Sequence, residues 1–313
     1  MSNIPKDKAD IGVLVGRFQV NQLHDGHIAL IESVLKHHKK VVVFLGVAPG
    51  LVTRNNPLDF VARKEMILQS FPQVTVLSIP DMPSDKEWSK TLDERIKEVA
   101  GVSSVLLYGG RGGFIERYFG VFPTKELGDF GGSSGTEVRK EVSAEVKASA
   151  DFRAGVIYAA YNQYPKVFPT VDVAIFKGDD LLLGRKAHQD KFRFLGGFTD
   201  PTDDSYEQAA RRETMEEVGI EIDGITYIGS AKIDDWRYRS EVDKIITLFF
   251  KAEYQFGNIV PQDDITEARF FKFNTLTRDD VVSEHQPLFD MLVSYMNRKE
   301  QTQPGKDTRA TTR

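Results

Sequence analysis

The sequence predicts two domains, an α/β domain built on a doubly wound parallel sheet and a following α+β domain. In the first half, short apolar runs alternate with stretches of helical periodicity, the order that produces parallel strands covered by helices. From residue 168 onward, short strands broken by turns surround one strong helix. We therefore place the domains at residues 1–165 and 166–300, with Pro165 and Pro169 marking the change.

Each element of the first domain is predicted from its local pattern. Apolar runs of strand length occupy residues 11–15, 41–47, 74–79 and 104–108. Helical periodicity covers residues 27–36, 60–70, 87–100 and 151–161, and another helix begins near residue 136. Glycine-rich loops lie at residues 109–113 and 131–135. The alternation of these elements favours right-handed crossovers between parallel strands.

The second domain has a different texture. Strands are predicted at residues 171–176, 181–184, 225–228 and 245–250, and the strong helix at residues 205–218. The end of the chain, from residue 297, is polar and rich in Lys, Arg, Thr and Gln. Such composition predicts disorder, and we assign residues 301–313 as a disordered tail.

Composition excludes several classes of function. The net charge of -5 argues against non-specific nucleic-acid binding. The absence of cysteine excludes disulfides, thiolate metal sites and a cysteine nucleophile. The first ten residues contain no signal-peptide pattern and no apolar run has membrane-spanning length, so we expect a cytoplasmic protein that binds neither membranes nor nucleic acid.

The first candidate site is a turn between the first strand and the first helix. Arg17, His24 and His27 lie in this turn. Gly26 lies between the two histidines, and because it has no side chain a phosphate can approach the backbone closely there. Anions bind where a strand leads into a helix N-terminus. Adenylyl transfer needs positioning and positive charge more than covalent help. The alternative is a solvated helix N-terminus with two incidental histidines.

A second turn supports the first. Ser134, Gly135, Thr136 and Arg139 again stand at a predicted helix start, where hydroxyl, backbone and guanidinium groups suit phosphate binding. The alternative is a capped helix with a surface arginine. The two turns fall where a mononucleotide-binding fold would use them, which favours a shared phosphate site.

These motifs resemble the nucleotidyltransferase superfamily, whose fold is Rossmann-like. A narrower resemblance, to the archaeal-type nicotinamide mononucleotide (NMN) adenylyltransferases, rests on the segment from Asn56-Pro57 to Met66-Ile67, and on Ile79-Pro80-Asp81 followed by Trp88. The sequence departs from that family at residues 20–23 and 58–59, and Arg54 is shifted by one position.

The resemblance implies the role of each residue. It implies a catalytic role for Arg17, His24, His27 and Arg139. It implies ATP binding by Gly16, Phe18, Gln19, Gly26, Ser134, Thr136 and Arg139. It implies NMN binding by Arg54, Asn56, Asp81 and Trp88, with the indole stacked on the pyridinium ring. Trp88 packed in the core is the alternative.

The second candidate site is the acidic helix. Glu213, Glu216 and Glu217 share one face because they are three and four residues apart. Three carboxylates on one face repel each other unless a cation neutralises them, and hard divalent cations prefer oxygen ligands. Asp204 and Glu207 have capping-box spacing, so Asp204 is expected to open the helix. An ordinary acidic surface is the alternative.

The segment from Gly196-Gly197-Phe198 to Gly219-Ile220 resembles the Nudix box, with Asp204 in place of its first glutamate, one residue late. The resemblance implies Mg²⁺, with Mn²⁺ as an alternative, bound by Gly197, Glu213, Glu216 and Glu217, the last two also catalytic. It implies substrate contacts from Arg185, Gly197, Arg212 and Trp236. Glu241 and Glu267 are candidate general bases, or surface acids.

Together the resemblances imply a bifunctional, multidomain enzyme of NAD biosynthesis. Its first domain would join ATP and NMN into NAD and pyrophosphate, and its second, similar to ADP-ribose pyrophosphatases, would hydrolyse ADP-ribose to AMP and ribose 5-phosphate. Nicotinate mononucleotide, FMN or phosphopantetheine remain alternative acceptors, a ligand-sensing second domain remains an alternative, and a homo-oligomer remains open. The other histidines, His37, His38, His188 and His285, are expected to be surface or structural.

Overall fold

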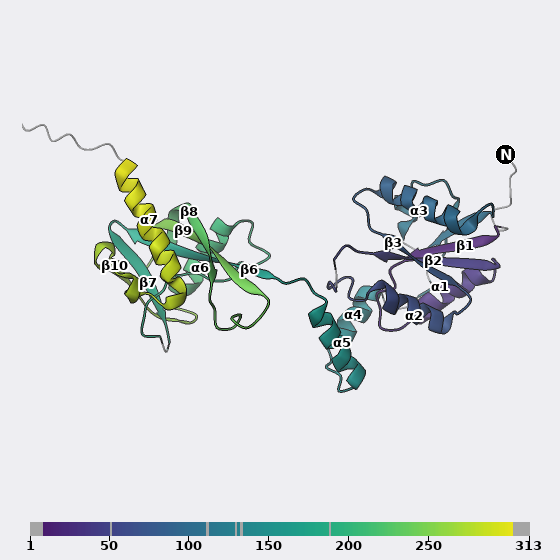
Figure 1. The fold of residues 1–313 in the computed structure, drawn as a ribbon, viewed down its shortest axis with the longest axis horizontal. Coiled ribbons are helices and arrows are strands. Elements are labelled where there is room, and N and C mark those ends of the chain that lie inside the picture. Colours follow the sequence, from purple (N-terminus) through teal and green to yellow (C-terminus); the bar gives the residue numbers. More distant parts are fainter. Residues whose placement is uncertain are drawn as a thin grey trace, which may run out of the picture. The chain divides into compact units, whose positions relative to one another are not determined.

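The computed structural model of the protein describes residues 9–50, 52–110, 113–128, 130–131, 134–187 and 189–302. The chain divides into two compact units, Met1–Tyr164 and Pro165–Arg313 (Figure 1). Each unit is described by itself below. Of the histidines that the sequence leaves without a partner, His188 lies outside the described residues.

The first unit contains a five-stranded sheet in the order β3-β2-β1-β4-β5. All neighbouring strands are parallel, and β1 pairs with both β2 and β4. This order confirms the doubly wound parallel sheet. The strands are added on one side of β1 as far as β3 and then on its other side from β4, so the strand order reverses between β1 and β4. The strands are β1 (Ile11–Gly16), β2 (Lys40–Val47), β3 (Thr75–Pro80), β4 (Val105–Gly109) and the unpredicted, three-residue β5 (Thr124–Glu126).

Alternate residues of β2 supply the cores on the two faces of this sheet. Val41, Val43 and Leu45 pack in one cluster with residues of α1 and α2. Val42 and Phe44 pack in the other with residues of α3. The helices are α1 (Asp25–Leu35), α2 (Phe60–Ser70), α3 (Asp85–Ala100), α4 (Gly135–Ser143) and α5 (Ala150–Tyr161), with a short 3-10 helix η1 (Phe114–Arg117) after β4.

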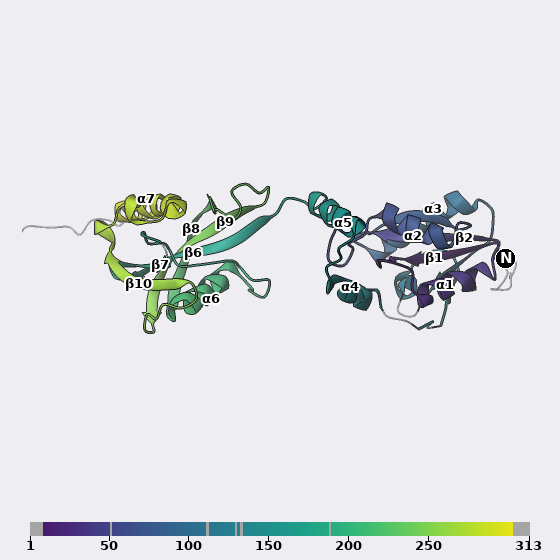
Figure 2. The same ribbon diagram turned by 90° about the horizontal axis from the view of Figure 1, so that it is seen from below.

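The second unit contains a mixed sheet in the order β10-β7-β6-β9-β8. Only the β6–β9 pair in this sheet is parallel. The sheet lies between helices α6 and α7 (Figure 2), which contribute to separate core clusters. The elements are β6 (Val167–Lys177), β7 (Asp180–Lys186), α6 (Tyr206–Val218), β8 (Glu221–Ile233), β9 (Lys244–Phe256), β10 (Ile265–Lys272) and α7 (Gln286–Thr302). Three short 3-10 helices, η2 (Phe273–Thr275), η3 (Arg278–Asp280) and η4 (Ser283–His285), connect β10 to α7.

Helix α7 corrects the expectation of disorder near the C-terminus. It runs to Thr302, so residues 297–302 are helical, and residues 303–313 lie outside the described part. Leu288, Phe289 and Leu292 form an apolar stripe at helical spacing and are buried. Packing of that stripe stabilises a helix whose polar last turns gave no signal of their own. No helix of the described chain combines the length and hydrophobicity that a membrane span requires.

Candidate functional sites

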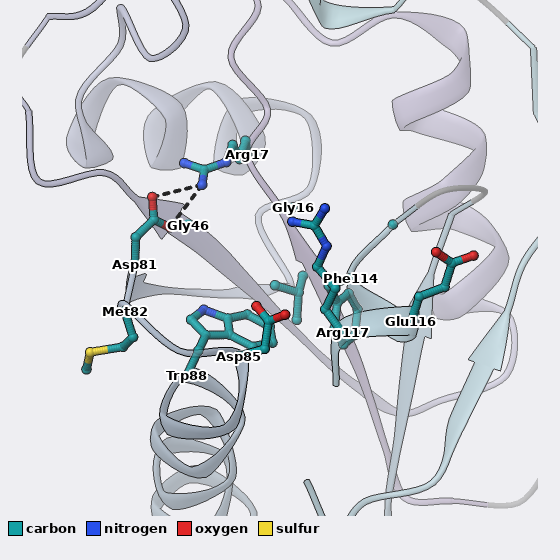
Figure 3. A pocket seen from close by; sticks show the side chains of 12 residues that line it. Gly16, Arg17, Gly46, Asp81, Met82, Asp85, Trp88, Phe114, Glu116 and Arg117 are labelled. Atoms are coloured by element: carbon teal, nitrogen blue, oxygen red, sulfur yellow. Dashed lines mark hydrogen bonds and ion pairs between the residues drawn. The ribbon is translucent and has the colours of Figure 1, made fainter. Parts of the chain in front are cut away.

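Two of the cavities that the described residues of the first unit form open near the carboxyl ends of the parallel strands, where doubly wound sheets bind ligands. One, of about 660 Å³, is lined by residues of β1, β2, α3 and η1 together with Asp81 (Figure 3). The other, of about 530 Å³, is lined by residues around the His24–His27 turn and the start of α4. Arg17 lines both cavities. We name them the acceptor-side and the phosphate-side cavity, respectively.

The two histidines of the first turn are stacked on each other. His24 is the N-cap of α1, and its Nδ1 accepts a hydrogen bond from the His27 backbone N–H at 3.4 Å. The ring centroids are 3.7 Å apart. Burial, followed by repulsion from His24, lowers the pKa of His27 to about 4, so its imidazole is neutral at pH 7. Within the described chain the buried Nδ1 of His27 has no partner.

The turn at α4 has the predicted helix start. Ser134 caps the helix, and with Glu137 it forms a capping box, so the Ser134 hydroxyl is engaged in the cap. Arg139 and Thr136 line the phosphate-side cavity beside His27. The Arg139 guanidinium donates to the Gln19 carbonyl at 3.2 Å and to the Thr136 hydroxyl at 3.1 Å. These bonds bring the two sequence-distant turns together as predicted.

The side chain of Gln19 forms hydrogen bonds within the protein. Its side-chain amide donates to the Leu58 carbonyl at 3.0 Å and accepts from the Leu58 N–H at 2.9 Å. It is 4% exposed, so the amide holds the turn before α2, and Gln19 is also among the residues that line the phosphate-side cavity. Phe18 is likewise buried and packs against His27, with the two ring centroids 4.7 Å apart. Both residues belong to the lining of the phosphate-side cavity, and their ATP-binding role stays a prediction.

Arg63 lies in the segment that carries the narrower resemblance, and the structure gives it a structural role that the sequence did not predict. Although charged, it is 1% exposed. Its guanidinium donates to the carbonyls of Arg17, at 2.7 Å, and Gly46, at 2.9 Å, and to that of Asp59, at 3.0 Å. A buried guanidinium is tolerated when its N–H groups are satisfied. Arg63 therefore fixes the backbone that carries Arg17.

The acceptor-side cavity contains the predicted Asp81 and Trp88. The Arg17 guanidinium bridges the two Asp81 oxygens at 3.0 and 2.8 Å and donates to Asn56 Oδ1 at 3.0 Å (Figure 3). Trp88, on the first turns of α3, is half-buried and contacts the edge of Phe114. Arg54 is exposed and lines neither cavity, so its expected role in NMN binding stays a prediction.

In the second unit, the predicted acidic residues line a cavity of about 340 Å³. Gly197 lies against the Glu213 carboxylate, since a Cβ at this position would lie 2.3 Å from Glu213 Oε2 and would displace that side chain. Glu217 is 4% exposed and accepts a hydrogen bond from the Gly196 N–H at 2.8 Å. Burial raises the pKa of Glu217 to about 8 and also raises that of Glu213. Glu216 lines the same cavity.

Asp203, and not Asp204, is the acid that completes the motif. The Arg212 guanidinium forms a bidentate pair with Asp203 at 3.0 and 2.8 Å, and also contacts Glu213 at 2.7 Å and Glu216 at 3.1 Å. The N-cap of α6 is Ser205, so Asp204 does not open the helix as expected. The extra residue therefore lies between this acid and Arg212. Arg212 orients carboxylates and is not free to bind substrate.

Replacing Asp203 with Asn is expected to lower the thermal midpoint by a few degrees at pH 7, because Arg212 loses its charged partner. The hydrogen bonds from Arg212 lower the pKa of Asp203 from 3.8 to about 2. This contribution is fully present above pH 4 and is lost as the pH falls toward 2. Thermal melts of D203N, with D204N as the matched control, measure it. Equal midpoints for the two variants across pH 2 to 7 would contradict the pairing.

The carboxylates suit a divalent cation chemically, although they are not gathered around one point. Among the described residues, no three acidic or histidine side chains are grouped so that they could hold a metal ion. Arg212 draws Glu213 and Glu216 to itself, and Glu217 is turned to Gly196. Carboxylate oxygens are nevertheless the donors that Mg²⁺ and Mn²⁺ prefer, and a buried carboxylate gains most from a cation. Glu213, Glu216, Glu217 and the Gly197 carbonyl fit that role.

A buried polar cluster under this cavity was missed by the sequence analysis. Asp172 is 6% exposed, accepts from the Thr247 hydroxyl at 2.6 Å, and has its pKa raised to about 7 by burial. His285, which is 2% exposed, lies 3.7 Å from Asp172 and 3.0 Å from the Arg193 guanidinium. His285 is structural as expected, but it lines the cavity. These residues come from distant segments, so no local motif connects them.

Other predicted Nudix residues are not among those that line the cavity. Arg185 forms an ion pair with Glu267, and neither residue lines the cavity. Glu241 is exposed and also lies outside the lining. Trp236 is 78% exposed and is not among the lining residues. The cations that do line the cavity are Lys186, Arg193 and Arg237.

An acidic helix packed on a mixed sheet, with a glycine loop against its carboxylates, defines the second unit. Residues 166–292 match the family model described as NUDIX domain, so this part of the chain is a Nudix domain. The NAD-capped RNA hydrolase NudC of Pseudomonas aeruginosa is 36% identical over 118 residues, which are 37% of this chain and 40% of the relative. NudC of Pseudomonas syringae pv. tomato is 35% identical over 116 residues, 36% of this chain and 39% of the relative. The chain thus spans well under half the length of these curated relatives.

Solved structures give weaker likenesses. A bifunctional NMN adenylyltransferase/ADP ribose pyrophosphatase from Francisella tularensis, complexed with AMP and a manganese ion, aligns over 93% of this chain and 99% of that chain, with 20% identity and a TM-score of 0.42. A Nudix hydrolase from Nitrosomonas europaea aligns over 46% of this chain and 78% of that chain, with 20% identity and a TM-score of 0.38. Scores at this level are too low to establish a shared fold or function.

Proposed function

We propose that the first unit transfers the adenylyl group of ATP to NMN, giving NAD and pyrophosphate. The observation that carries this proposal is the position of Arg17 between two cavities. One cavity offers His27, Thr136 and Arg139 to phosphates, and the other offers an indole and a carboxylate to a cationic ring. A phosphate of the acceptor and the α-phosphate of ATP would meet beside Arg17.

In this reaction an oxygen of the acceptor phosphate attacks the α-phosphorus of ATP, and pyrophosphate leaves. The acceptor phosphate is largely ionised at pH 7, so no general base is required. His24 and His27 at the start of α1, with Arg17 and Arg139, would stabilise the negative charge that develops on the phosphates. The neutral His27 ring can donate one N–H to an oxygen without the cost of burying a second positive charge.

Trp88→Ala is expected to weaken NMN binding about tenfold, because the pyridinium ring loses its aromatic face. ATP affinity should change less than twofold, since Trp88 does not line the phosphate-side cavity. Isothermal titration calorimetry with each ligand measures both. Equal losses for NMN and ATP would refute NMN as the acceptor and leave nicotinate mononucleotide, FMN or phosphopantetheine to be tested.

For the Nudix domain we propose hydrolysis of ADP-ribose to AMP and ribose 5-phosphate. The cavity combines cations, Lys186, Arg193 and Arg237, with the carboxylates of α6, as a diphosphate and its counter-cation require. A bound diphosphate would compete with Asp264 for Lys186 and with Asp235 for Arg237. A bound Mg²⁺ or Mn²⁺ would supply an activated water and neutralise diphosphate charge. The chain's own residues would hold that ion, grip the diphosphate and shape the cavity.

A second candidate substrate is a NAD-type dinucleotide, because the NudC relatives are named as hydrolases of NAD-capped RNA. Mass spectrometry of the products after incubation with Mg²⁺ and a panel of ADP-ribose, NAD and other nucleoside diphosphate derivatives separates the candidates. If no compound of this panel is cleaved, the Nudix domain acts as a ligand sensor. Addition of ATP with each mononucleotide acceptor tests the first unit in the same assay.

A further inference from the structure

We propose that Arg117, on the 3-10 helix after β4, binds the phosphate of the acceptor nucleotide. This inference rests on the proposed adenylyl transfer and names the cation that recognises the phosphorylated end of the acceptor. Sequence reasoning gave that role to Arg54, which lines neither cavity. Arg117 lines the acceptor-side cavity together with Trp88 and Asp81, and its side chain points into it (Figure 3).

Among the described residues that line this cavity, Arg117 is the arginine that forms no ion pair. Two guanidinium groups line it, those of Arg17 and Arg117. Arg17 is engaged by Asp81 and Asn56. The Arg117 guanidinium has neither a hydrogen bond nor an ion pair with any described residue. A planar guanidinium can bind two phosphate oxygens at once, which makes it the suited group for this anion.

The segment that carries Arg117 is fixed in place by helix α3. Ser89 and Asp93 lie one helical turn apart and are 1% and 5% exposed. The Ser89 hydroxyl accepts from the Phe119 N–H at 2.9 Å, and Asp93 accepts from the Val121 N–H at 2.9 Å. The Tyr118 hydroxyl also donates to Asp93, and burial raises the pKa of Tyr118.

These contacts join the two sides of the cavity. Trp88 precedes Ser89 on α3, and Arg117 precedes Tyr118 on the opposite segment, so each ligand-facing residue is adjacent to an anchored one. Phe114 packs between the rings of Trp88 and Tyr118, with its ring centroid 5.8 Å from that of Trp88 and 6.0 Å from that of Tyr118. The ring-binding and phosphate-binding groups are therefore held at a fixed separation. Such preorganisation reduces the entropy lost on binding.

The test compares a ligand that carries the phosphate with one that lacks it. Calorimetry of the full-length protein measures the affinities for NMN and for nicotinamide riboside, its unphosphorylated form. We expect the wild type to bind NMN at least about tenfold more tightly. In Arg117→Gln this ratio should fall by about tenfold, with riboside affinity unchanged. Arg117→Lys should retain part of it, and Trp88→Ala should weaken both ligands equally.

A ratio that stays at its wild-type value in Arg117→Gln overturns the assignment. A loss of the ratio in Arg54→Gln instead transfers the role to Arg54. Arg117 is exposed, so its substitution should leave the fold intact, which a thermal melt checks. If the wild type binds neither pyridine compound, the proposed adenylyl transfer to NMN fails, and this inference falls with it. That outcome differs from the failure of Arg117 alone, in which NMN still binds.

Discussion

Glu217→Gln is expected to reduce ADP-ribose cleavage by at least about a hundredfold, while adenylyl transfer keeps its wild-type rate. The substitution removes a carboxyl that a bound divalent cation would hold in its ionised form, and loss of a carboxylate ligand costs more than the ten- to hundredfold typical of residues behind it. The amide oxygen of Gln can still accept from the Gly196 N–H, so the fold should persist. Rates of AMP and NAD formation measure the two activities.

The matched control for Glu217 is Glu207→Gln on the same helix. Glu207 is exposed and does not line the cavity, so its substitution should leave both activities unchanged. Cleavage that persists in E217Q, or a parallel loss of NAD formation, would contradict the assignment of hydrolysis to this cavity. Titration of Mg²⁺ and Mn²⁺ into the wild type and E217Q gives an independent measure, since the variant should bind either ion more weakly.

His27→Ala is expected to slow adenylyl transfer by about a hundredfold, the effect of removing one hydrogen-bond donor from a developing charge. Stacking against His24 and Phe18 holds the ring in place. Its pKa of about 4 means that the neutral ring is the form present at pH 7. The expected loss should therefore be the same from pH 6.5 to 8. Initial rates of NAD formation with saturating ATP and NMN measure it.

The control for His27 is His37→Ala, which replaces an exposed histidine that lines neither cavity. ADP-ribose cleavage should be unaffected in both variants, so H27A and E217Q are each other's internal control. A rate loss below about threefold in H27A would leave His27 as a packing residue of the turn. A loss of cleavage in H27A would show general unfolding instead of a catalytic defect.

The sequence predicted those parts of the sites that lie close together along the chain. His24 and His27 are three residues apart at a helix start, and Glu213, Glu216 and Glu217 share one helical face, so spacing alone placed them. The doubly wound sheet followed from alternating periods of apolar residues.

Residues that act across the fold could not be found in this way. Arg63 binds carbonyls at the ends of β1 and β2, and Asp93 binds a segment 28 residues further on. Likewise, Asp172 and His285 meet only in the folded domain. The choice between Asp203 and Asp204 depended on which side chain reaches Arg212, and a one-residue shift in a loop leaves no mark in a pattern. Long-range polar contacts are thus the part that required coordinates.

Because Arg17 lines both cavities of the first unit, its position bears on whether binding in one cavity affects binding in the other. The Arg17 guanidinium lines both cavities, and Arg63 holds the Arg17 backbone by donating a hydrogen bond to its carbonyl. A ligand that drew it away from Asp81 would change the charge available to the other cavity, so two ligands bound in this way would be thermodynamically linked. Linkage is reciprocal: the factor by which one ligand alters the affinity for the second equals the factor by which the second alters the affinity for the first. One side chain is enough to make two neighbouring binding equilibria interdependent.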